Sequence, residues 1–536
     1  MSEFFFRTED LQPDEVLSYF VETQQDRQIV NALKNRNPTI LVGSRGVGKS
    51  FLLRVAQKEL LDSFEKDRIF PVYLSFVRSS LISTADPSQF KHWMLARITA
   101  TIIRSLSKAG LLGAVPKSVK LLAGDAVSTE MAQTAIEKLA DAYEDSWKSP
   151  GKKIDGDGLL DIDQFRDAME DLSDEIDVKR FVLLIDEAAH IFLPEQQRQF
   201  FTLFRDMRSP NITCNAAVYP GVTSFGDSFQ PAHDATMLHI DRDVLHDSYL
   251  ENMREIVEKQ ADSSFLKSIN NYRENFAILA YAASGNPRIL LKTVSVAPKL
   301  NSTEVNDVVR NYYRSDIWAE HSLLADKYVG HKEVIDWGRM FVESSVLPDI
   351  KAKNDVALAS DKATSAYFWV SRETPAVIKE ALRVLAYTGI LNEQDAGIKA
   401  SRSQIGQRYV VNLGCLFALE QTPTSTAFEI ARNLTPKRMT EFGANHPTYK
   451  SLADRAASLG TDEPTFVLER QLEKPVSVLD ISDWQKEKLR DISLDTVGDV
   501  LKATEEKLKE AMYVGPVRAR QMRNAAVSAV LEYLSG

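Results

Sequence analysis

Residues 39–50 read Thr39-Ile40-Leu41-Val42-Gly43-Ser44-Arg45-Gly46-Val47-Gly48-Lys49-Ser50. An apolar run ends in a glycine-rich turn, and an amphipathic segment that begins with Phe51 and extends to Phe64 follows it. This order predicts a strand, a tight turn and a helix, which is the context in which the pattern G-x-x-x-x-G-K-[ST] marks a phosphate-binding loop. The stretch therefore predicts an α/β fold built around a nucleotide.

The residue types of this loop suit the chemistry of phosphate binding. Glycine lets the backbone approach a ligand closely and adopt positive φ angles. The N–H groups of the turn and of the helix N-terminus attract anions. Lys49 is expected to reach the β- and γ-phosphates, and the Ser50 hydroxyl is expected to bind Mg²⁺. The predicted nucleotide contacts are Gly43, Ser44, Arg45, Gly46, Val47, Gly48, Lys49, Ser50 and Phe51.

Length and composition limit the class of protein. A chain of 536 residues is long enough for three or four domains. The net charge of -10 excludes a surface that is basic throughout, so any nucleic-acid contact needs a local basic face. Cys214 and Cys415 lie far apart, which predicts free thiols in a reducing cytoplasm. No signal peptide or apolar run of membrane-spanning length is present, so we expect a cytoplasmic protein that does not contact a membrane.

A second motif lies at residues 180–187, where the apolar run Phe181-Val182-Leu183-Leu184-Ile185 ends in Asp186-Glu187. A continuous apolar run is typical of a central parallel strand, and open α/β sheets bind ligands at the carboxyl ends of such strands. Downstream of the phosphate loop, this stretch resembles a Walker B motif. The resemblance implies that Asp186 and Ser50 hold Mg²⁺ and that Glu187 polarises the attacking water. The predicted catalytic residues are Lys49, Asp186 and Glu187.

Three further strands, at residues 68–76, 213–219 and 237–240, complete a five-stranded core that resembles the AAA+ ATPases. In those proteins the strand after Walker B ends in a polar residue that senses the γ-phosphate. Tyr219 and Thr223 are the two candidates here, and both stay open. Asn215 lies earlier in the strand and is expected to be structural.

A trans-acting arginine is missing from its usual place. Many AAA+ proteins carry this arginine between the strand just described and the next, but residues 219–236 contain none. Arg205 and Arg208 precede that strand and are expected to be surface residues. Hydrolysis that depends on oligomerisation is therefore not assured.

The turn Gly285-Asn286-Pro287-Arg288 separates two helical patterns, and proline is favoured in the first turn of the second. It resembles the sensor-2 turn in the helical lid of origin-recognition initiators and of the related STAND ATPases. The resemblance implies that Arg288 approaches the γ-phosphate and links lid position to nucleotide state. A plain link between two helices is the alternative.

Residues 375–412 read as a helix, a polar hairpin and a strand, an order similar to a winged helix, which follows the lid in both ATPase groups. Winged helices bind DNA or dock proteins, and the sequence leaves the two uses open. The basic residues available are Lys379, Arg383, Lys399, Arg402 and Arg408.

The last residues, 476–536, form a compact helical pattern that resembles a helix-hairpin-helix unit, as in the C-terminal domain of the bacterial RNA polymerase α subunit. There a glycine-rich hairpin offers N–H groups to a DNA phosphate. Gly515 and Ala519 match that motif, while Tyr513 replaces its usual first glycine. The basic residues expected to contact double-stranded DNA are Arg518, Arg520 and Arg523.

The sequence thus predicts an AAA+-type parallel sheet with a helical lid, followed by winged-helix and all-α helix-hairpin-helix domains. The expected units are an ATPase core at 1–241, a lid at 242–325, a winged helix at 326–420, a linker or helical segment at 421–475 and the terminal domain at 476–536. The aromatic lead-in before residue 24 is expected either to cover the adenine or to pack on the first strand.

Two functions follow from the resemblances. The first is a slow ATPase, with ATP and Mg²⁺ as cofactors, that couples nucleotide state to DNA binding. The second is a STAND-like signalling or antiviral-defence scaffold that binds ATP and assembles with itself or with protein partners.

Overall fold

The computed structural model describes residues 4–76, 88–112, 117–123, 134–146, 154, 156, 159–188, 194–221, 223, 225, 228–327, 332–400, 404–450, 472–479, 481–519, 521–523, 525 and 526. The candidate DNA contacts Arg402 and Arg520 lie outside these residues. Within the described part, no helix is long and apolar enough to cross a membrane.

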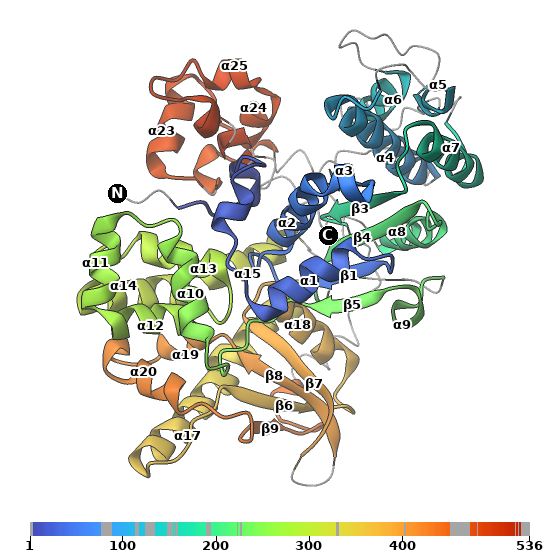
Figure 1. Ribbon diagram of the computed structural model, residues 1–536. Coiled ribbons are helices and arrows are strands. Elements are labelled where there is room, and N and C mark those ends of the chain that lie inside the picture. Colours follow the sequence, from blue (N-terminus) through green and yellow to red (C-terminus); the bar gives the residue numbers. More distant parts are fainter. Residues whose placement is uncertain are drawn as a thin grey trace.

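A five-stranded parallel sheet forms the centre of the N-terminal half (Figure 1). Its strands are β1 (Thr39–Val42), β2 (Ile69–Ser75), β3 (Arg180–Asp186), β4 (Ile212–Val218) and β5 (Thr236–His239). Their order is β2-β3-β4-β1-β5, so β4 lies between the strand of the phosphate loop and the strand that ends in Asp186. All five predicted strands are confirmed, and because every pairing is parallel their carboxyl ends meet at one edge.

Both faces of the sheet are buried, which explains the continuous apolar runs. Val182 and Leu184 of β3 face a cluster that includes residues of α1 (Gln24–Lys34) and α2 (Lys49–Asp62). Leu183 and Ile185 face the opposite cluster, which includes residues of α4 (Ser88–Lys108) and α8 (Pro194–Asp206). Alternate residues of β3 therefore face opposite clusters, and helices cover both faces of the sheet.

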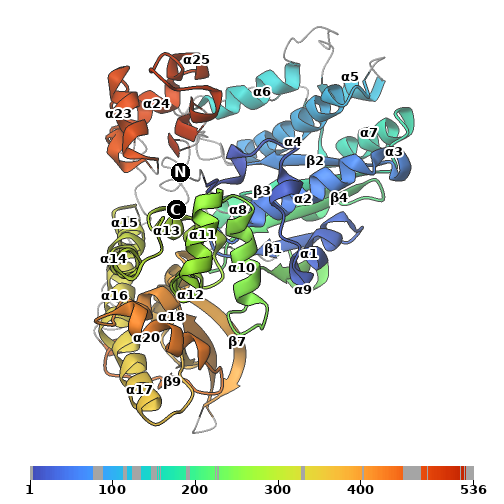
Figure 2. The same cartoon turned by 60° about the vertical axis from the view of Figure 1, so that its left-hand side comes forward.

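Helices are inserted between β2 and β3, where they group as one unit beside the β2 edge (Figures 1 and 2). They are α4, α5 (Lys117–Ala123), α6 (Ala135–Glu144) and α7 (Ile162–Glu175). The shorter elements of the core are η1 (Thr8–Asp10), η2 (Val16–Tyr19), α3 (Phe64–Asp67) and α9 (Pro231–Asp234).

A helical unit follows the sheet. It contains α10 (Tyr249–Glu258), α11 (Ser263–Asn271), α12 (Arg273–Ala282), α13 (Pro287–Ser295) and α14 (Ser302–Asn311). The side chain of Asn286 accepts a hydrogen bond from the Ile289 N–H and so caps α13, with Pro287 in its first turn. The predicted break between two helices at residues 285–288 is confirmed.

The third unit combines helices with a second sheet. Its helices are η5 (Tyr312–Asp316, a π-helical turn), α15 (Ile317–Lys327), α16 (Lys332–Phe341), η7 (Val342–Val346, also π-helical), α17 (Leu347–Ala359), α18 (Ala376–Tyr387), α19 (Leu413–Phe417) and α20 (Pro423–Arg432). The sheet order is β7-β8-β6-β9, with bounds β6 (Tyr367–Ser371), β7 (Leu391–Lys399), β8 (Ile405–Val411) and β9 (Thr440–Phe442).

Part of the segment expected to be a linker packs into these units. Strand β9 pairs in parallel with β6, and α20 contacts α12 and α14 of the preceding helical unit. Both elements depend on long-range pairing that local sequence patterns do not report. The described C-terminal helices are η8 (Val476–Val478), α23 (Asp483–Asp491), α24 (Val497–Lys502) and α25 (Glu505–Leu508), and they form a group of their own in Figure 1.

Candidate nucleotide site

The phosphate loop joins β1 to α2 and needs glycine at two positions. Gly46 and Gly48 have φ angles of 85° and 103°, in the left-handed region that other residues rarely adopt. A Cβ atom on Gly46 would also lie 2.7 Å from Oδ1 of Asn286 and 2.8 Å from Cβ of Arg288. The loop therefore lies directly against the turn that begins α13.

Lys49 is folded back into the loop. Its Nζ donates hydrogen bonds to the carbonyl oxygens of Gly43 (2.7 Å) and Ser44 (3.0 Å). The same Nζ lies 3.6 Å from the centre of the Tyr219 ring. Burial lowers the pKa of Lys49 to about 7, against the raising effect of the Glu187 and Asp186 carboxylates. The buried Lys49 Nζ is therefore held by oxygen and aromatic partners.

Asp186 ends β3 beside the loop, where two hydroxyl groups hold its carboxylate. The Tyr73 hydroxyl donates to Oδ2 over 2.6 Å, and the Ser50 side chain forms a hydrogen bond with the same carboxylate. Burial and the neighbouring Glu187 raise the pKa of Asp186 to about 6.

The oxygens of Ser50 and Asp186 fit a magnesium site of the kind that uses few protein ligands. Mg²⁺ usually takes one or two protein oxygens and completes its shell with water and phosphate. Among the described residues, no group of three or more His, Cys, Asp or Glu side chains is arranged to hold a metal by itself. Substrate phosphates would therefore have to supply part of the shell.

Glu187 follows Asp186 in a left-handed conformation, with φ of 54°, which turns its side chain toward β4. There its Oε1 accepts a hydrogen bond from the Tyr219 hydroxyl over 3.1 Å. Thr223, the alternative to Tyr219, donates its hydroxyl to the Tyr219 carbonyl and so holds the loop after β4. Of the two candidates, the structure brings Tyr219 to the site.

Asn215 has the structural role that its position predicts. Its Oδ1 accepts from the Thr39 N–H over 2.9 Å, and its Nδ2 donates to the Leu33 carbonyl over 2.9 Å. It therefore fixes the start of β1 and the end of α1, at the edge of the sheet away from the phosphate loop.

The lid turn holds the loop by two hydrogen bonds and the lead-in by a third. Asn286 Nδ2 donates to the Arg45 carbonyl over 2.7 Å, and the Arg288 N–H donates to the Gly46 carbonyl over 3.4 Å. The third comes from Arg288 Nε, which donates to the Phe6 carbonyl over 2.9 Å. Arg288 lines the same cavity as Lys49.

Arg242 contacts the phosphate loop, and no sequence motif indicates this role. Its side chain donates to the Val47 carbonyl over 2.6 Å and pairs with Asp26 of α1 over 3.2 Å. Its own carbonyl lies 2.6 Å from where a Cβ on Gly285 would sit. Arg242 thus ties the phosphate loop, α1 and the lid together, but a lone arginine just after a short strand carries no motif.

The N-terminal lead-in forms one wall of the cavity. The apolar residues that line it are Phe5, Phe6, Leu11, Tyr19, Phe20, Val21, Phe51, Leu52, Ile256 and Leu291. Phe5 N–H donates to Gln260 Oε1 over 2.9 Å, and Lys259 Nζ donates to the Phe20 carbonyl over 2.7 Å. The lead-in also packs on the sheet, since Phe20 shares a buried cluster with Leu41 of β1.

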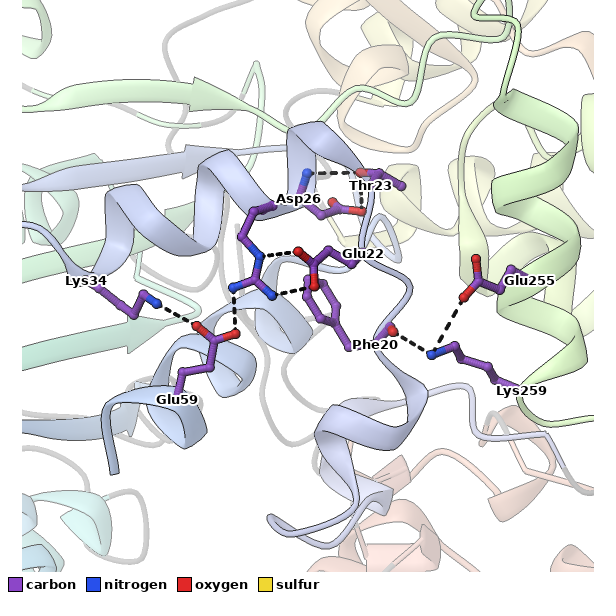
Figure 3. A network of polar contacts seen from close by, with 9 residues as sticks. Phe20, Glu22, Thr23, Asp26, Lys34, Glu59, Glu255 and Lys259 are labelled. Carbon is purple, nitrogen blue, oxygen red and sulfur yellow. Dashed lines mark hydrogen bonds and ion pairs between the residues drawn. The ribbon is translucent and has the colours of Figure 1, made fainter. Parts of the chain in front are cut away.

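Figure 3 shows the polar contacts that anchor this lead-in to α1 and to α10. Arg27 pairs with Glu22 in the lead-in and with Glu59 of α2, and Lys34 also pairs with Glu59. On the other side, Lys259 at the end of α10 reaches the lead-in backbone. The lead-in therefore connects the sheet unit to the lid.

The third unit covers the phosphate end of the site. Arg45 of the loop pairs with Glu320 of α15 over 3.3 Å. A Cβ on Gly389, just after α18, would lie 3.9 Å from the Ser44 side chain. A Cβ on Gly221, just after β4, would lie 2.6 Å from the Arg383 carbonyl of α18. Helix α18 is therefore packed against the ATPase core.

Several basic residues proposed for partners also make contacts within the chain. Arg408 pairs with Asp395 and lies over the Tyr367 ring, and Lys379 donates to the Arg372 carbonyl. Arg518 donates to the Tyr513 carbonyl over 2.9 Å and lies 4.9 Å from the Trp484 ring centre. Arg205 and Arg208 are exposed, as expected, and Arg205 also donates to the Ser228 carbonyl.

The sheet order, the glycine-rich loop before α2 and the carboxylates after β3 define the fold of an AAA+-type P-loop ATPase. Residues 4–81, which include the loop, match the model of the family described as ORC-CDC6-like. No curated protein matches the chain at a significant level.

Two solved structures are similar over most of the chain. The Walker-type ATPase PABY2304 of Pyrococcus abyssi has a TM-score of 0.38 at 13% identity, covering 77% of this chain and 96% of that one. The Aeropyrum pernix Orc1 protein in complex with DNA has a TM-score of 0.33 at 11% identity, covering 79% of this chain and 94% of that one. At these scores the likeness carries no argument, so the fold assignment depends on the chain's own strand order and loop.

Proposed function

We propose that this chain binds ATP with Mg²⁺ and hydrolyses it slowly. The observation that carries the proposal is that Lys49, Ser50 and Glu187 line one cavity, while Asp186 is hydrogen-bonded to the Ser50 side chain. An ammonium, a hydroxyl and two carboxylates are the groups that phosphoryl transfer to water requires.

Each residue has a separate role in this proposal. Lys49 leaves the Gly43 and Ser44 carbonyls and binds the β- and γ-phosphates, whose negative charge is a stronger partner. Ser50 and Asp186 hold Mg²⁺, which supplies charge neutralisation when bound. Glu187 orients the attacking water, and Arg288 faces the γ-phosphate from the lid. The aromatic wall formed by the lead-in takes the base.

We further propose that nucleotide state is coupled to double-stranded DNA binding. In this proposal the chain divides into the core (1–241), the lid (242–325), a winged helix (326–420) and a terminal helix-hairpin-helix domain (476–536). The hairpin around Gly515 and the basic residues Arg518, Arg520 and Arg523 would contact DNA phosphates. The lid and the third unit both touch the phosphate loop, so a change at the loop has a direct route to them.

A STAND-like scaffold is the second candidate. In it, ATP exchange would govern assembly with protein partners, and hydrolysis would be slow. The packing of α15 and α18 against the loop favours this candidate, because a nucleotide that displaced them would expose new surface.

One experiment tests hydrolysis, DNA coupling and assembly together. ATPase activity of the full chain is measured with and without double-stranded DNA over a range of protein concentrations. Lys49→Ala should abolish nucleotide binding, whereas Glu187→Gln should retain bound ATP without hydrolysing it. Lys58→Ala, on the same helix and paired with Asp62, is the matched control and should behave as wild type. Full activity in both site variants would contradict the site.

Activity that rises with DNA supports the DNA-coupled ATPase. ATPase activity that does not change with DNA but rises with protein concentration supports the scaffold instead.

A further inference from the structure

Tyr219 contacts both the third unit and the residues assigned to hydrolysis at the nucleotide site. Its side chain is buried, and its hydroxyl donates to Glu187 while its ring lies on the Lys49 ammonium. The two groups that it contacts are those assigned above to water activation and phosphate binding.

The ring of Tyr219 is buried in a small apolar cluster that belongs otherwise to the third unit. In the described part of the chain, the members of this cluster are Tyr219, Leu324 and Ala325 of α15, Ile335 of α16 and Tyr387 of α18. Tyr219 and Tyr387 meet edge to face, with ring centres 5.8 Å apart. Packing of α15, α16 and α18 therefore determines where the Tyr219 ring lies.

The contacts of Tyr219 restrain both groups. The Tyr219 hydroxyl donates to Oε1 of Glu187 and so competes with water for that oxygen. Lys49, held under the ring by two carbonyl oxygens, is directed into the loop instead of toward a phosphate. Binding of ATP has to draw Lys49 away from the ring.

We propose that Tyr219 is a positioning residue, set by α15, α16 and α18, that holds Glu187 and Lys49 in a restrained arrangement. The proposal rests on the proposed ATPase function and adds to it the residue through which the third unit controls the site. Release of Tyr387 or of the Tyr219 hydroxyl then frees Glu187 to act on water.

The first test separates the hydroxyl from the ring by steady-state kinetics of the full chain. Tyr219→Phe keeps the ring on Lys49 and in the cluster but removes the donor to Glu187. We expect kcat to rise three- to tenfold, with KM for ATP within twofold of wild type. Tyr387→Leu, which releases the ring, should raise kcat in the same way, and the double variant should not exceed the larger single effect.

A matched control is Tyr281→Phe, a lid tyrosine that stacks on Tyr249 outside the cavity, which should change neither constant. An unchanged or lower kcat in Tyr219→Phe, or fully multiplicative effects of the two variants, would overturn the proposal.

The second test does not depend on hydrolysis. Amide hydrogen exchange of residues 384–390 is measured with and without the non-hydrolysable β,γ-imido analogue of ATP. The analogue should accelerate exchange there in the wild-type chain, because Lys49 leaves the ring. Tyr219→Leu should show the faster exchange without analogue and respond no further.

An analogue that binds without changing exchange at residues 384–390, or a response that persists in Tyr219→Leu, refutes the positioning role while leaving nucleotide binding intact. If the wild-type chain binds no analogue, the proposed function fails as well, so the two failures are distinguishable.

Discussion

Arg288 Nε donates a hydrogen bond to the carbonyl oxygen of Phe6 over 2.9 Å, which joins the lid to the N-terminal lead-in across the nucleotide cavity. The arginine proposed to face the γ-phosphate is therefore oriented by the backbone carbonyl of Phe6. Removal of residues 1–11 should lower affinity for a fluorescent ATP analogue at least tenfold, as measured by titration.

Replacing both Phe5 and Phe6 with leucine separates the two contributions of the lead-in, because this variant keeps the Phe6 carbonyl but loses two aromatic rings of the cavity wall. This variant should lose less affinity than the truncation. An affinity unchanged by truncation would show that the lead-in is not a wall of the site.

Gly46→Ala should weaken ATP binding more than a hundredfold. The added methyl group would meet Asn286 Oδ1 at 2.7 Å, in addition to the cost of a positive φ. Gly110→Ala is the matched control, since Gly110 has a φ of 72° with nothing within 4 Å of the added Cβ. Isothermal titration of both variants with ATP compares the substitution in the loop with the same substitution at a positive-φ glycine outside the cavity. Equal ATP affinities of the two variants would mean that the lid turn does not contact Gly46 in solution.

Arg242→Met should lower the free energy of unfolding by about 3 kcal/mol, because it leaves the buried Asp26 carboxylate without its cationic partner. Arg254→Met removes an i,i+4 pair with Glu258 at the surface and should cost about 0.5 kcal/mol or less. Urea denaturation of the two variants makes the comparison. A loss of the same size in both would mean that Asp26 is hydrated in the folded chain.

The buried, neutral His321 should lower the free energy of unfolding as the pH falls into the mildly acidic range. Burial lowers the pKa of His321 to about 4, below its usual 6.5, while its Nε2 proton is donated to the Ile335 carbonyl. Between these values the unfolded chain binds a proton that the folded chain does not, so the free energy of unfolding falls by about 1.4 kcal/mol for each pH unit. The contribution is complete above pH 6.5 and is lost as the pH falls to 4.

His321→Gln removes this titration, so the difference in unfolding free energy between wild type and variant should change over the same range. A difference that is constant with pH would mean that the ring is hydrated in the folded state.

DNA binding through phosphates should depend steeply on salt. Replacing Arg518 and Arg523 with glutamine should weaken binding to any duplex and lower the slope of log K against log salt by about 1 for each phosphate that is no longer neutralised. Lys66→Gln with Lys108→Gln removes the same charge from the core and should leave the slope unchanged, as read by fluorescence anisotropy. Because Arg518 is held by Tyr513 and Trp484, replacing it alone should have the smaller effect.

Local sequence was sufficient to predict the strand, loop and turn that form the proposed nucleotide site. The loop at residues 43–50, the strand that ends in Asp186 and Glu187, and the turn at Arg288 depend on local residue types at fixed spacing. Backbone sterics, helix capping and apolar periodicity act over a few residues, so they can be read without a fold.

How distant parts complete that site became visible only in the folded chain. The aromatic lead-in, Arg242 and the third-unit helices reach the loop from residues far away in the chain, and no local pattern encodes such contacts. Tyr219 and Thr223 are equal sensor candidates in the sequence, and only the packing of the folded chain brings the Tyr219 hydroxyl to Glu187 and its ring among the side chains of α15, α16 and α18. This is because burial of one aromatic ring depends on every element that encloses it, and these elements meet only when the chain has folded.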